Sequence, residues 1–387
     1  MNFVCPRYLK NRFIPIFYCS VIFAAPALPD PITITDIGPA LGGDSTVAGI
    51  NSSGQVAGST LNGTGLSAVG NVFFYSAGVT TNLGTIGGRS AGATGLNNSG
   101  QIVGSTDLTG IGQTGFLYSK GSTAYLPATF SPAGINDSGV IAGSATFSGS
   151  TAFHAALDSN GTLTDLGTLG GSFIYSQANA INNSGQVVGN SSVLNGTNPT
   201  AAFLYSNGVM TNIGSANNLP WSTATAISNN GEVVGYSAPG DFSGPGTEAF
   251  TYINGKLTAL GTGPGTGSEA FGVNDEGEVV GSYYTPDGFS YTSTAFLYAN
   301  GAFIDLNSLL PANSPWDLTE AIGINDAGQI VGIGYLNGNT GQGQNQVFLL
   351  DLGSSSALTP EPASLVLLAL GLGLFVLGFR ARRHQSD

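Results

Sequence analysis

Short apolar runs alternate with turn-forming residues along most of the chain, and this pattern predicts β-strands joined by tight turns. The runs are rich in Val, Ile, Phe and Tyr, which pack well in sheets, and the intervening residues are mostly Gly, Ser, Thr and Asn. Runs such as Ala-Phe-Leu-Tyr at 202–205 place apolar side chains on both faces of a strand, because neighbouring residues point to opposite sides. Both faces of these strands must therefore be buried.

A ten-residue core of the form Gly/Ala-Ile-Asn-x-x-Gly-x-Val-Val-Gly recurs seven times. Its copies stand at 49–58, 95–104, 134–143, 180–189, 226–235, 272–281 and 323–332. An aliphatic residue, a polar turn with Gly at positive φ, and a second apolar stretch are the signature of a hairpin. A second hairpin follows in each unit, as at 202–214, so each unit supplies four strands.

The spacing of the copies, 39 to 51 residues, is typical of one four-stranded propeller blade. Stacked blades cover both faces of the middle strands, whereas a lone sandwich sheet leaves one face in water. We therefore predict an all-β fold, a seven-bladed β-propeller of four-stranded blades over residues 28–353. The strand at 32–37 is the missing partner of the strand at 347–350, so we expect the ring to close by pairing of these N- and C-terminal strands.

The first 27 residues have the features of a signal peptide. Basic residues precede the apolar stretch 13–24, and Ala25-Pro26-Ala27 is a small-x-small pattern suited to signal peptidase. Both cysteines, Cys5 and Cys19, lie in this segment, so we expect an exported mature protein without a thiol. A disulfide scaffold and a thiol enzyme are excluded.

The C-terminal end has three parts. The linker 354–362 contains Pro360, Glu361 and Pro362, the apolar run 363–379 is predicted to be a transmembrane helix, and the basic tail 380–387 is predicted to stay cytoplasmic. The residues that orient the helix are Arg380, Arg382 and Arg383.

This end resembles the PEP-CTERM sorting signal, with Ala363 where the commonest form has Ser or Thr. The resemblance implies recognition and cleavage by an exosortase, in bacteria that make exopolysaccharide. An ordinary C-terminal membrane anchor is the alternative.

The repeat unit also resembles the HAF family of extracellular repeats, named for a His-Ala-Phe at the start of the third strand. His154-Ala155 retains the first two residues, with Ala156 in place of Phe, and the other units keep the aromatic residue at Phe73, Phe116, Phe203, Phe250, Phe296 and Phe348. This resemblance spans roughly 32–353 and implies export, and it brings no catalytic mechanism.

The chain carries a net charge of −13, and only 8% of its residues are charged. Six of the nine basic residues lie in the two end segments, which leaves Arg89, Lys120 and Lys256 in the body. Such a surface repels DNA and RNA, which require cationic patches, so we expect no nucleic-acid partner.

The body of the chain contains few residues that could act in catalysis or bind a metal. His154 is its one histidine, so His-based metal sites and Ser-His-Asp catalysis lack residues that they need. Two sets of acids recur at repeat phase where other units have Ser or Asn, and we predict that both cap turns locally: Asp137, Asp275 and Asp326 in the first hairpin, and Asp36, Asp165 and Asp305 after the third strand. We predict no catalytic residue, no metal and no cofactor. The alternative of calcium at Asp275, Glu276 and Glu278 lacks the alternating spacing of a calcium loop.

Four aromatic residues are candidates for stacking on sugar rings: Phe173, Tyr175, Trp221 and Trp316. The competing interpretation is that they fill gaps between blades.

Six further acids fall outside the repeat phase, and we assign them to variable connections between strands: Asp107, Asp241, Glu269, Asp287, Asp317 and Glu320.

These features together favour an exported, surface-anchored structural or adhesive repeat protein of the bacterial envelope or extracellular matrix, and not an enzyme. Its expected partners are an exosortase, exopolysaccharide or another envelope component, and the membrane through the C-terminal helix. One alternative is a lectin-like propeller with Trp221, Trp316 and the off-phase acids on one face. Another is a polysaccharide-cleaving enzyme, which would need a pair of carboxylates at or beside the central channel.

Overall fold

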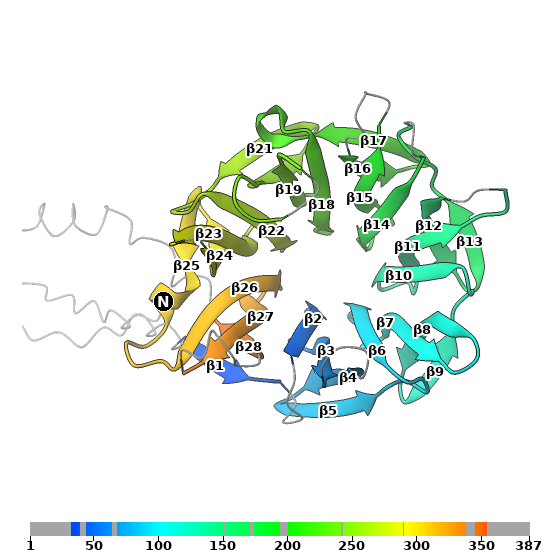
Figure 1. The fold of residues 1–387 in the computed structure, drawn as a ribbon, viewed down its shortest axis with the longest axis horizontal. Coiled ribbons are helices and arrows are strands. Elements are labelled where there is room, and N and C mark those ends of the chain that lie inside the picture. The colour runs from blue at the N-terminus through cyan, green and yellow to red at the C-terminus, as the bar shows by residue number, and fades with distance from the viewer. Residues whose placement is uncertain are drawn as a thin grey trace, which may run out of the picture.

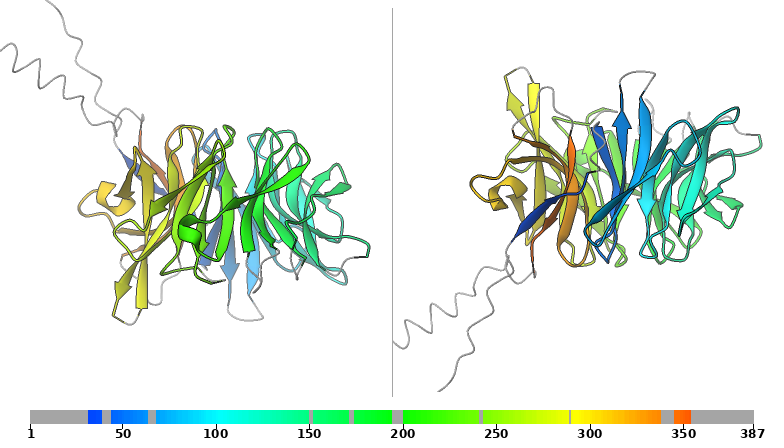
Figure 2. Two further views of the ribbon diagram at one scale, coloured as in Figure 1. Left: turned by 90° about the horizontal axis from the view of Figure 1, so that it is seen from above. Right: turned by 90° about the horizontal axis from the view of Figure 1, so that it is seen from below.

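The computed structural model describes residues 32–38, 44–63, 68–149, 152–170, 174–193, 200–240, 243–288, 290–337 and 345–353. They form seven four-stranded antiparallel sheets, arranged around a ring as the blades of a β-propeller (Figure 1). The predicted fold is confirmed. Seen from the side, the ring is a disc whose strands run across its thickness (Figure 2).

The signal peptide, sorting linker, transmembrane helix and basic tail predicted at the two ends lie outside the described residues. Within the described part of the chain, no helix is long and apolar enough to cross a membrane.

The blades follow one another in chain order, each built from the channel outward. Blade 1 contains β2 (Asp44–Ile50), β3 (Val56–Asn62), β4 (Val69–Ser76) and β5 (Val79–Gly84), and blade 2 contains β6 (Ala91–Leu96), β7 (Ile102–Leu108), β8 (Gly112–Ser119) and β9 (Ser122–Tyr125). Blade 3 contains β10 (Phe130–Ile135), β11 (Ile141–Thr146), β12 (Phe153–Ser159) and β13 (Thr162–Asp165), and blade 4 contains β14 (Ser176–Ile181), β15 (Val187–Ser192), β16 (Thr200–Ser206) and β17 (Val209–Gly214).

Blade 5 contains β18 (Trp221–Ile227), β19 (Val233–Ala238), β20 (Glu248–Ile253) and β21 (Lys256–Gly261), and blade 6 contains β22 (Gly267–Val273), β23 (Val279–Asp287), β24 (Ser290–Ala299) and β25 (Ala302–Asp305). Blade 7 contains β26 (Trp316–Ile324), β27 (Gln329–Leu336), β28 (Gln346–Asp351) and β1 (Thr33–Asp36). Two short 3₁₀ segments, η2 (Ala216–Asn218) and η3 (Leu306–Leu309), lie between blades.

Each repeat core forms the predicted hairpin between the first two strands of its blade. In blade 1, the side-chain oxygen of Asn51 accepts the backbone N–H groups of Ser53 and Gln55 over 3.1 and 3.0 Å, and Gly54 has a φ of +71°. The central glycine of every copy lies in this left-handed region, which an L side chain adopts only with strain. The prediction of positive φ is confirmed.

The last glycine of the core is required for a different reason. In blade 4, the pairing of β14 with β15 shifts register between Ala178 and Ala180, and a Cβ on Gly189 would collide with the carbonyl oxygen of Gln177. The backbone of the paired strand leaves no room for a side chain at this position, so only hydrogen fits there.

The ring closes as predicted. β1 pairs with β28, with Thr33 opposite Asp351 and Asp36 opposite Phe348, so the N-terminal strand completes the last blade. Ile37 follows β1 and is 1% exposed, and its N–H donates to the carbonyl oxygen of Val347 over 3.0 Å. The two ends of the propeller are therefore held together without a covalent bond.

The core lies between the blades, as the two-sided apolar strands require. The aromatic residue of the third strand is fully buried in six blades, at Phe73, Phe116, Phe203, Phe250, Phe296 and Phe348. Packing in the core is therefore sufficient to explain why the repeat has an aromatic residue at this position.

The turn asparagines also connect neighbouring blades. Their side-chain N–H groups donate to the backbone carbonyl oxygen at the equivalent turn of the next blade, over 3.0 to 3.3 Å. The six donors are Asn51, Asn97, Asn136, Asn182, Asn274 and Asn325. We call this set the asparagine ring, and blade 5 has Ser228 in place of its donor.

The prediction for the first set of turn acids was wrong in one respect. Asp137 accepts the backbone N–H of Asn98 over 2.8 Å, Asp275 that of Asn229 over 2.7 Å, and Asp326 that of Asp275 over 2.8 Å. Each donor belongs to the adjacent blade, so these carboxylates join blades and do not cap their own turns. The position of an acid in the repeat does not show whether it caps its own turn or bonds the adjacent blade, because the partner is about one repeat away along the chain.

The second set does cap locally, as predicted. Asp36 accepts the N–H of Gly38 over 3.0 Å, Asp165 that of Gly167 over 2.8 Å, and Asp305 that of Asn307 over 2.8 Å.

Candidate functional site

A cavity of about 260 Å³ opens between blades 4 and 5, at the ends of the strands away from the asparagine ring. Blade 4 contributes Tyr175, Asn190 and Thr200, and blade 5 contributes Trp221 and Ser222 among others. The remaining lining residues are Thr223, Tyr236, Ala238 and Gly240. We call this cavity the aromatic pocket.

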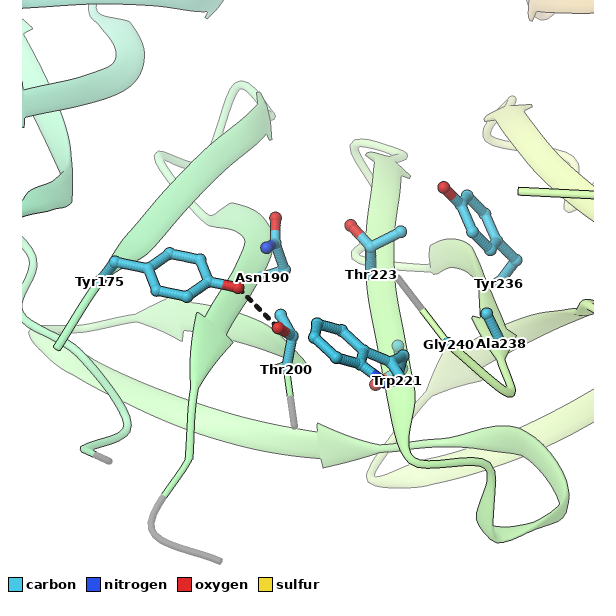
Figure 3. Close-up of a pocket in the computed structure, with 9 residues that line it drawn as sticks. Tyr175, Asn190, Thr200, Trp221, Thr223, Tyr236, Ala238 and Gly240 are labelled. Carbon is cyan, nitrogen blue, oxygen red and sulfur yellow. Dashed lines mark hydrogen bonds between the residues drawn. The ribbon is translucent and has the colours of Figure 1, made fainter. Parts of the chain in front are cut away.

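Two of the predicted aromatic candidates form opposite sides of this pocket. Tyr175 directly precedes β14 and Trp221 opens β18, so the innermost strands of adjacent blades place them side by side. Figure 3 shows their rings on the two sides of Thr200, with Asn190 between them. The Tyr175 hydroxyl lies 2.6 Å from the Thr200 hydroxyl, which fixes the tyrosine ring against blade 4.

The polar groups around the pocket are held by the contact between blades. The Ser222 hydroxyl donates to the carbonyl oxygen of Gly214 over 2.8 Å and accepts the N–H of Ala202 over 2.9 Å. Thr223 accepts the side-chain N–H of Asn179 over 3.2 Å. A rigid wall of this kind reduces the entropy that is lost when a ligand binds.

The other two aromatic candidates are not part of this pocket. Trp316 opens β26 in blade 7, at the position equivalent to Trp221, and its ring packs edge-on against Phe348 with centroids 6.2 Å apart. Trp316 is thereby packed against the apolar cluster that blades 6 and 7 share. Phe173 lies outside the described residues.

The off-phase acids are mostly in strands, contrary to the prediction of variable connections. Strands extend past the repeat core, so Asp107 lies in β7, Asp287 ends β23, and Asp317 and Glu320 belong to β26. Glu269 lies in β22, and Asp241 is outside the described residues.

Glu269 is the most deeply buried of these acids, at 2% exposed. Its carboxylate accepts the N–H of Gly244 over 2.8 Å and hydrogen-bonds to Tyr284 and Thr247. Burial, with a smaller contribution from the nearby carboxylate of Glu320, raises the pKa of Glu269 to about 7, although the hydrogen bonds to the carboxylate lower it. Burial also raises the pKa of Glu320.

Tyr236 connects this acidic cluster to the aromatic pocket. It lines the pocket, and burial followed by the charge of Glu269 raises its pKa above the ordinary value of 10.0. Its hydroxyl therefore stays protonated and can donate a hydrogen bond.

Two of the acids proposed for calcium binding are already engaged in hydrogen bonds. Asp275 accepts hydrogen bonds from Asn229, and Glu278 accepts one from the side chain of Asn274 over 2.8 Å. Within the described ranges, no group of three or more His, Cys, Asp or Glu side chains could hold a metal ion. His154 is paired with Asp165 at 2.9 Å.

Residues 358–383 match the family model described as the PEP-CTERM protein-sorting motif. The chain carries a PEP-CTERM sorting signal. The signal implies that the protein is exported, sorted to the cell envelope and processed by an exosortase. The three predicted motif residues, Pro360, Glu361 and Pro362, fall inside the match.

Residues 207–366 match a second family model, described as a protein of unknown function (DUF3466). The resemblance to HAF repeats stays a prediction. The search of curated proteins gave no match.

Solved structures show the same fold at low sequence identity. The β-propeller domain of the Trilobed protease from Pyrococcus furiosus, whose title reports an open velcro topology, is 9% identical with a TM-score of 0.53, covering 80% of this chain and 96% of that one. A fungal alcohol oxidase of the AA5 family, in complex with copper, is 14% identical with a TM-score of 0.51, covering 86% and 78%.

The acylaminoacyl peptidase of Pyrococcus horikoshii is 10% identical with a TM-score of 0.50, and the match covers 79% of this chain. The chain spans about half the length of that peptidase, 51%. Identities this low show the propeller fold alone, because the same fold carries binding, scaffolding and catalysis.

Proposed function

We propose that this protein is an adhesive component of the bacterial cell surface or extracellular matrix, and that it binds polysaccharide through the aromatic pocket. The observation that carries the proposal is the placement of Tyr175 and Trp221 on two sides of one cavity that also contains hydroxyl and amide groups. Sugar rings offer C–H faces that pack on aromatic rings and hydroxyls that exchange hydrogen bonds with such groups.

The sorting signal supports the same proposal. A protein sorted to the envelope meets polysaccharide at the cell surface, and a rigid disc with a pocket on one face can hold a polymer strand without closing over it. The pocket of about 260 Å³ suits part of one or two sugar units and not a large folded partner.

The polysaccharide-cleaving alternative is less well supported by the geometry. The carboxylate of Glu320 contributes to the raised pKa of Glu269, but Glu269 is buried and its carboxylate already bonds Gly244 and Tyr284. A glycosidase acid must reach the glycosidic oxygen. These contacts suit an acid that holds the chain segment around Gly244 in place.

The test is a binding measurement on the full chain purified from envelopes of cells that express it, with the polysaccharide of the producing bacterium as ligand. We expect saturable binding, and Trp221→Ala should weaken it about tenfold or more, since an aromatic contact of this kind contributes roughly 1–2 kcal/mol. Tyr291→Ala is the matched control, because Tyr291 is an aromatic residue 52% exposed on blade 6, away from the pocket.

Equal affinities for the wild type and the Trp221→Ala variant would refute this site. Folding of each variant is checked by its thermal midpoint. Release of new reducing ends during the incubation would instead favour the cleaving enzyme.

A further inference from the structure

A second and larger cavity, of about 550 Å³, lies between blades 1 and 2. Its residues stand at the beginnings of β2, β4, β6 and β8 and at the ends of β3 and β7. The aromatic pocket uses the equivalent strand ends of blades 4 and 5, so both cavities open on the same face of the disc, three blades apart. We call this cavity the hydroxyl cleft, and its volume lies within the range of ligand sites.

Six of the residues that line the cleft carry a hydroxyl group, and the hydrogen bonds of two of them, Ser59 and Ser90, leave the hydroxyl proton free to donate. The Ser59 oxygen accepts the N–H of Ala93 over 2.8 Å, and the Ser90 oxygen accepts the N–H of Gly70 over 2.8 Å. Because the backbone donor fixes each oxygen in place, the hydroxyl proton can point to a ligand.

Gln113 adds an amide to the rim. It is exposed, and its side-chain N–H donates to the Ser105 hydroxyl over 3.2 Å, which leaves its carbonyl oxygen as an acceptor for a ligand. Leu61, at 47% exposed, adds an apolar surface beside these polar groups. The described lining contains no aromatic side chain, so it offers a ligand hydrogen bonds but no aromatic ring on which to stack.

The charge of the cleft is negative. Asp107 is paired with Arg89 at 2.6 Å, whereas Asp44 has no basic partner among the described residues. An exposed carboxylate in a polyhydroxyl-binding cleft favours a cation on the ligand and disfavours an acidic sugar.

We infer that the hydroxyl cleft is a second saccharide site, and that it binds a sugar unit bearing a free amine. The amine pairs with Asp44, and the sugar hydroxyls exchange hydrogen bonds with Ser59, Ser90 and Gln113. The inference deepens the proposed function, on which it rests for the kind of ligand. Two sites on one face of the disc would allow one propeller to hold two strands of polymer, or one strand at two points.

The experiment measures binding of a glucosamine disaccharide, a probe too short to reach both cavities, to the full chain by calorimetry. The expected result is binding that Asp44→Asn and Gln113→Ala each weaken by about fivefold or more. Both side chains are exposed, so neither variant should lose its fold. Asp287→Asn, a change at an exposed acid of blade 6, is the matched control and should leave the affinity unchanged.

The N-acetylated disaccharide tests how much of the binding depends on the charged amine and how much on the rest of the sugar. We expect it to bind at least about fivefold more weakly, since acetylation removes the positive charge. Equal binding of the two probes, or unchanged affinity in both Asp44→Asn and Gln113→Ala, would overturn the inference.

The Trp221→Ala variant separates this inference from the proposed function. Binding that depends on Asp44 and persists in Trp221→Ala supports the hydroxyl cleft even if the aromatic pocket binds nothing. Binding lost in Trp221→Ala and unaffected by Asp44→Asn assigns the sugar to the aromatic pocket alone and overturns the second site.

Discussion

The side-chain N–H of Asn325 donates to the backbone carbonyl oxygen of Asn51 over 3.0 Å, although the two residues are 274 positions apart in the chain. Asn325 belongs to the last blade and Asn51 to the first, so this bond closes the asparagine ring on the face of the disc opposite the two cavities. The strand pairing of β1 with β28 closes the outer side of the same junction.

The one blade without an amide donor offers a direct test of the asparagine ring. Ser228 is 4% exposed, and its hydroxyl accepts the N–H of Glu232 over 3.1 Å, as the asparagine oxygens do elsewhere. Ser228→Asn should add the missing bond to the carbonyl oxygen of Asn274 and stabilise the fold by about 1 kcal/mol. Urea unfolding measures the change, and Ser122→Asn on the exposed strand β9 is the control. A loss of stability would mean that blades 5 and 6 leave no room for the amide.

Because Ile37 lies where the ring closes, we expect its truncation to lower the stability of the protein strongly. This side chain packs in a cluster with Val56 of blade 1 and Val331 of blade 7. Ile37→Ala should lower the free energy of unfolding by about 2–4 kcal/mol, because it leaves a cavity at the junction of the two ends. Ile111→Ala, at a residue 70% exposed, is the control for denaturant midpoints and should change little. Equal midpoints for the two variants would contradict the docking of the N-terminal segment.

The glycine that ends each repeat core has no room for a side chain, so we expect its replacement by alanine to destabilise the protein. Gly189→Ala should destabilise the protein by about 3 kcal/mol or more, since the new Cβ meets the carbonyl oxygen of Gln177 and the bulge cannot move without breaking its ladder. Gly208→Ala is a useful comparison, because a Cβ there meets no atom within 4 Å and only its φ of +82° is unfavourable. A smaller loss at Gly189 than at Gly208 would contradict the steric argument.

Glu269 predicts the direction of a pH effect on stability. Its pKa is raised from 4.5 to about 7 in the folded protein, mainly by burial, so between these values the folded state holds a proton that the unfolded state has released. Stability should therefore fall as the pH rises from about 4.5 to 7, by up to about 3 kcal/mol from this group. Glu269→Gln should remove that slope in urea unfolding curves recorded across the range. Parallel curves for the two proteins would refute the assignment.

Much of this protein can be read from its local pattern. The hairpin turns, the left-handed glycines such as Gly54, the count of seven blades and the pairing of β1 with β28 all depend on short-range geometry repeated in phase, so the sequence alone predicted them. The sorting motif is likewise a local signal, read from residues 358–383 without reference to the fold.

The contacts between blades depended on the tertiary structure. Asp137 and Asp165 are the same residue type at repeat phase, yet one bonds the adjacent blade and the other caps its own turn. Trp221 and Trp316 open equivalent strands, yet one lines a pocket with Tyr175 and the other packs on Phe348. A periodic sequence fixes each blade, because its hydrogen bonds join residues close along the chain. What faces a side chain across the gap between blades depends on the neighbouring repeat, and only the assembled ring decided which positions became core and which became cavity.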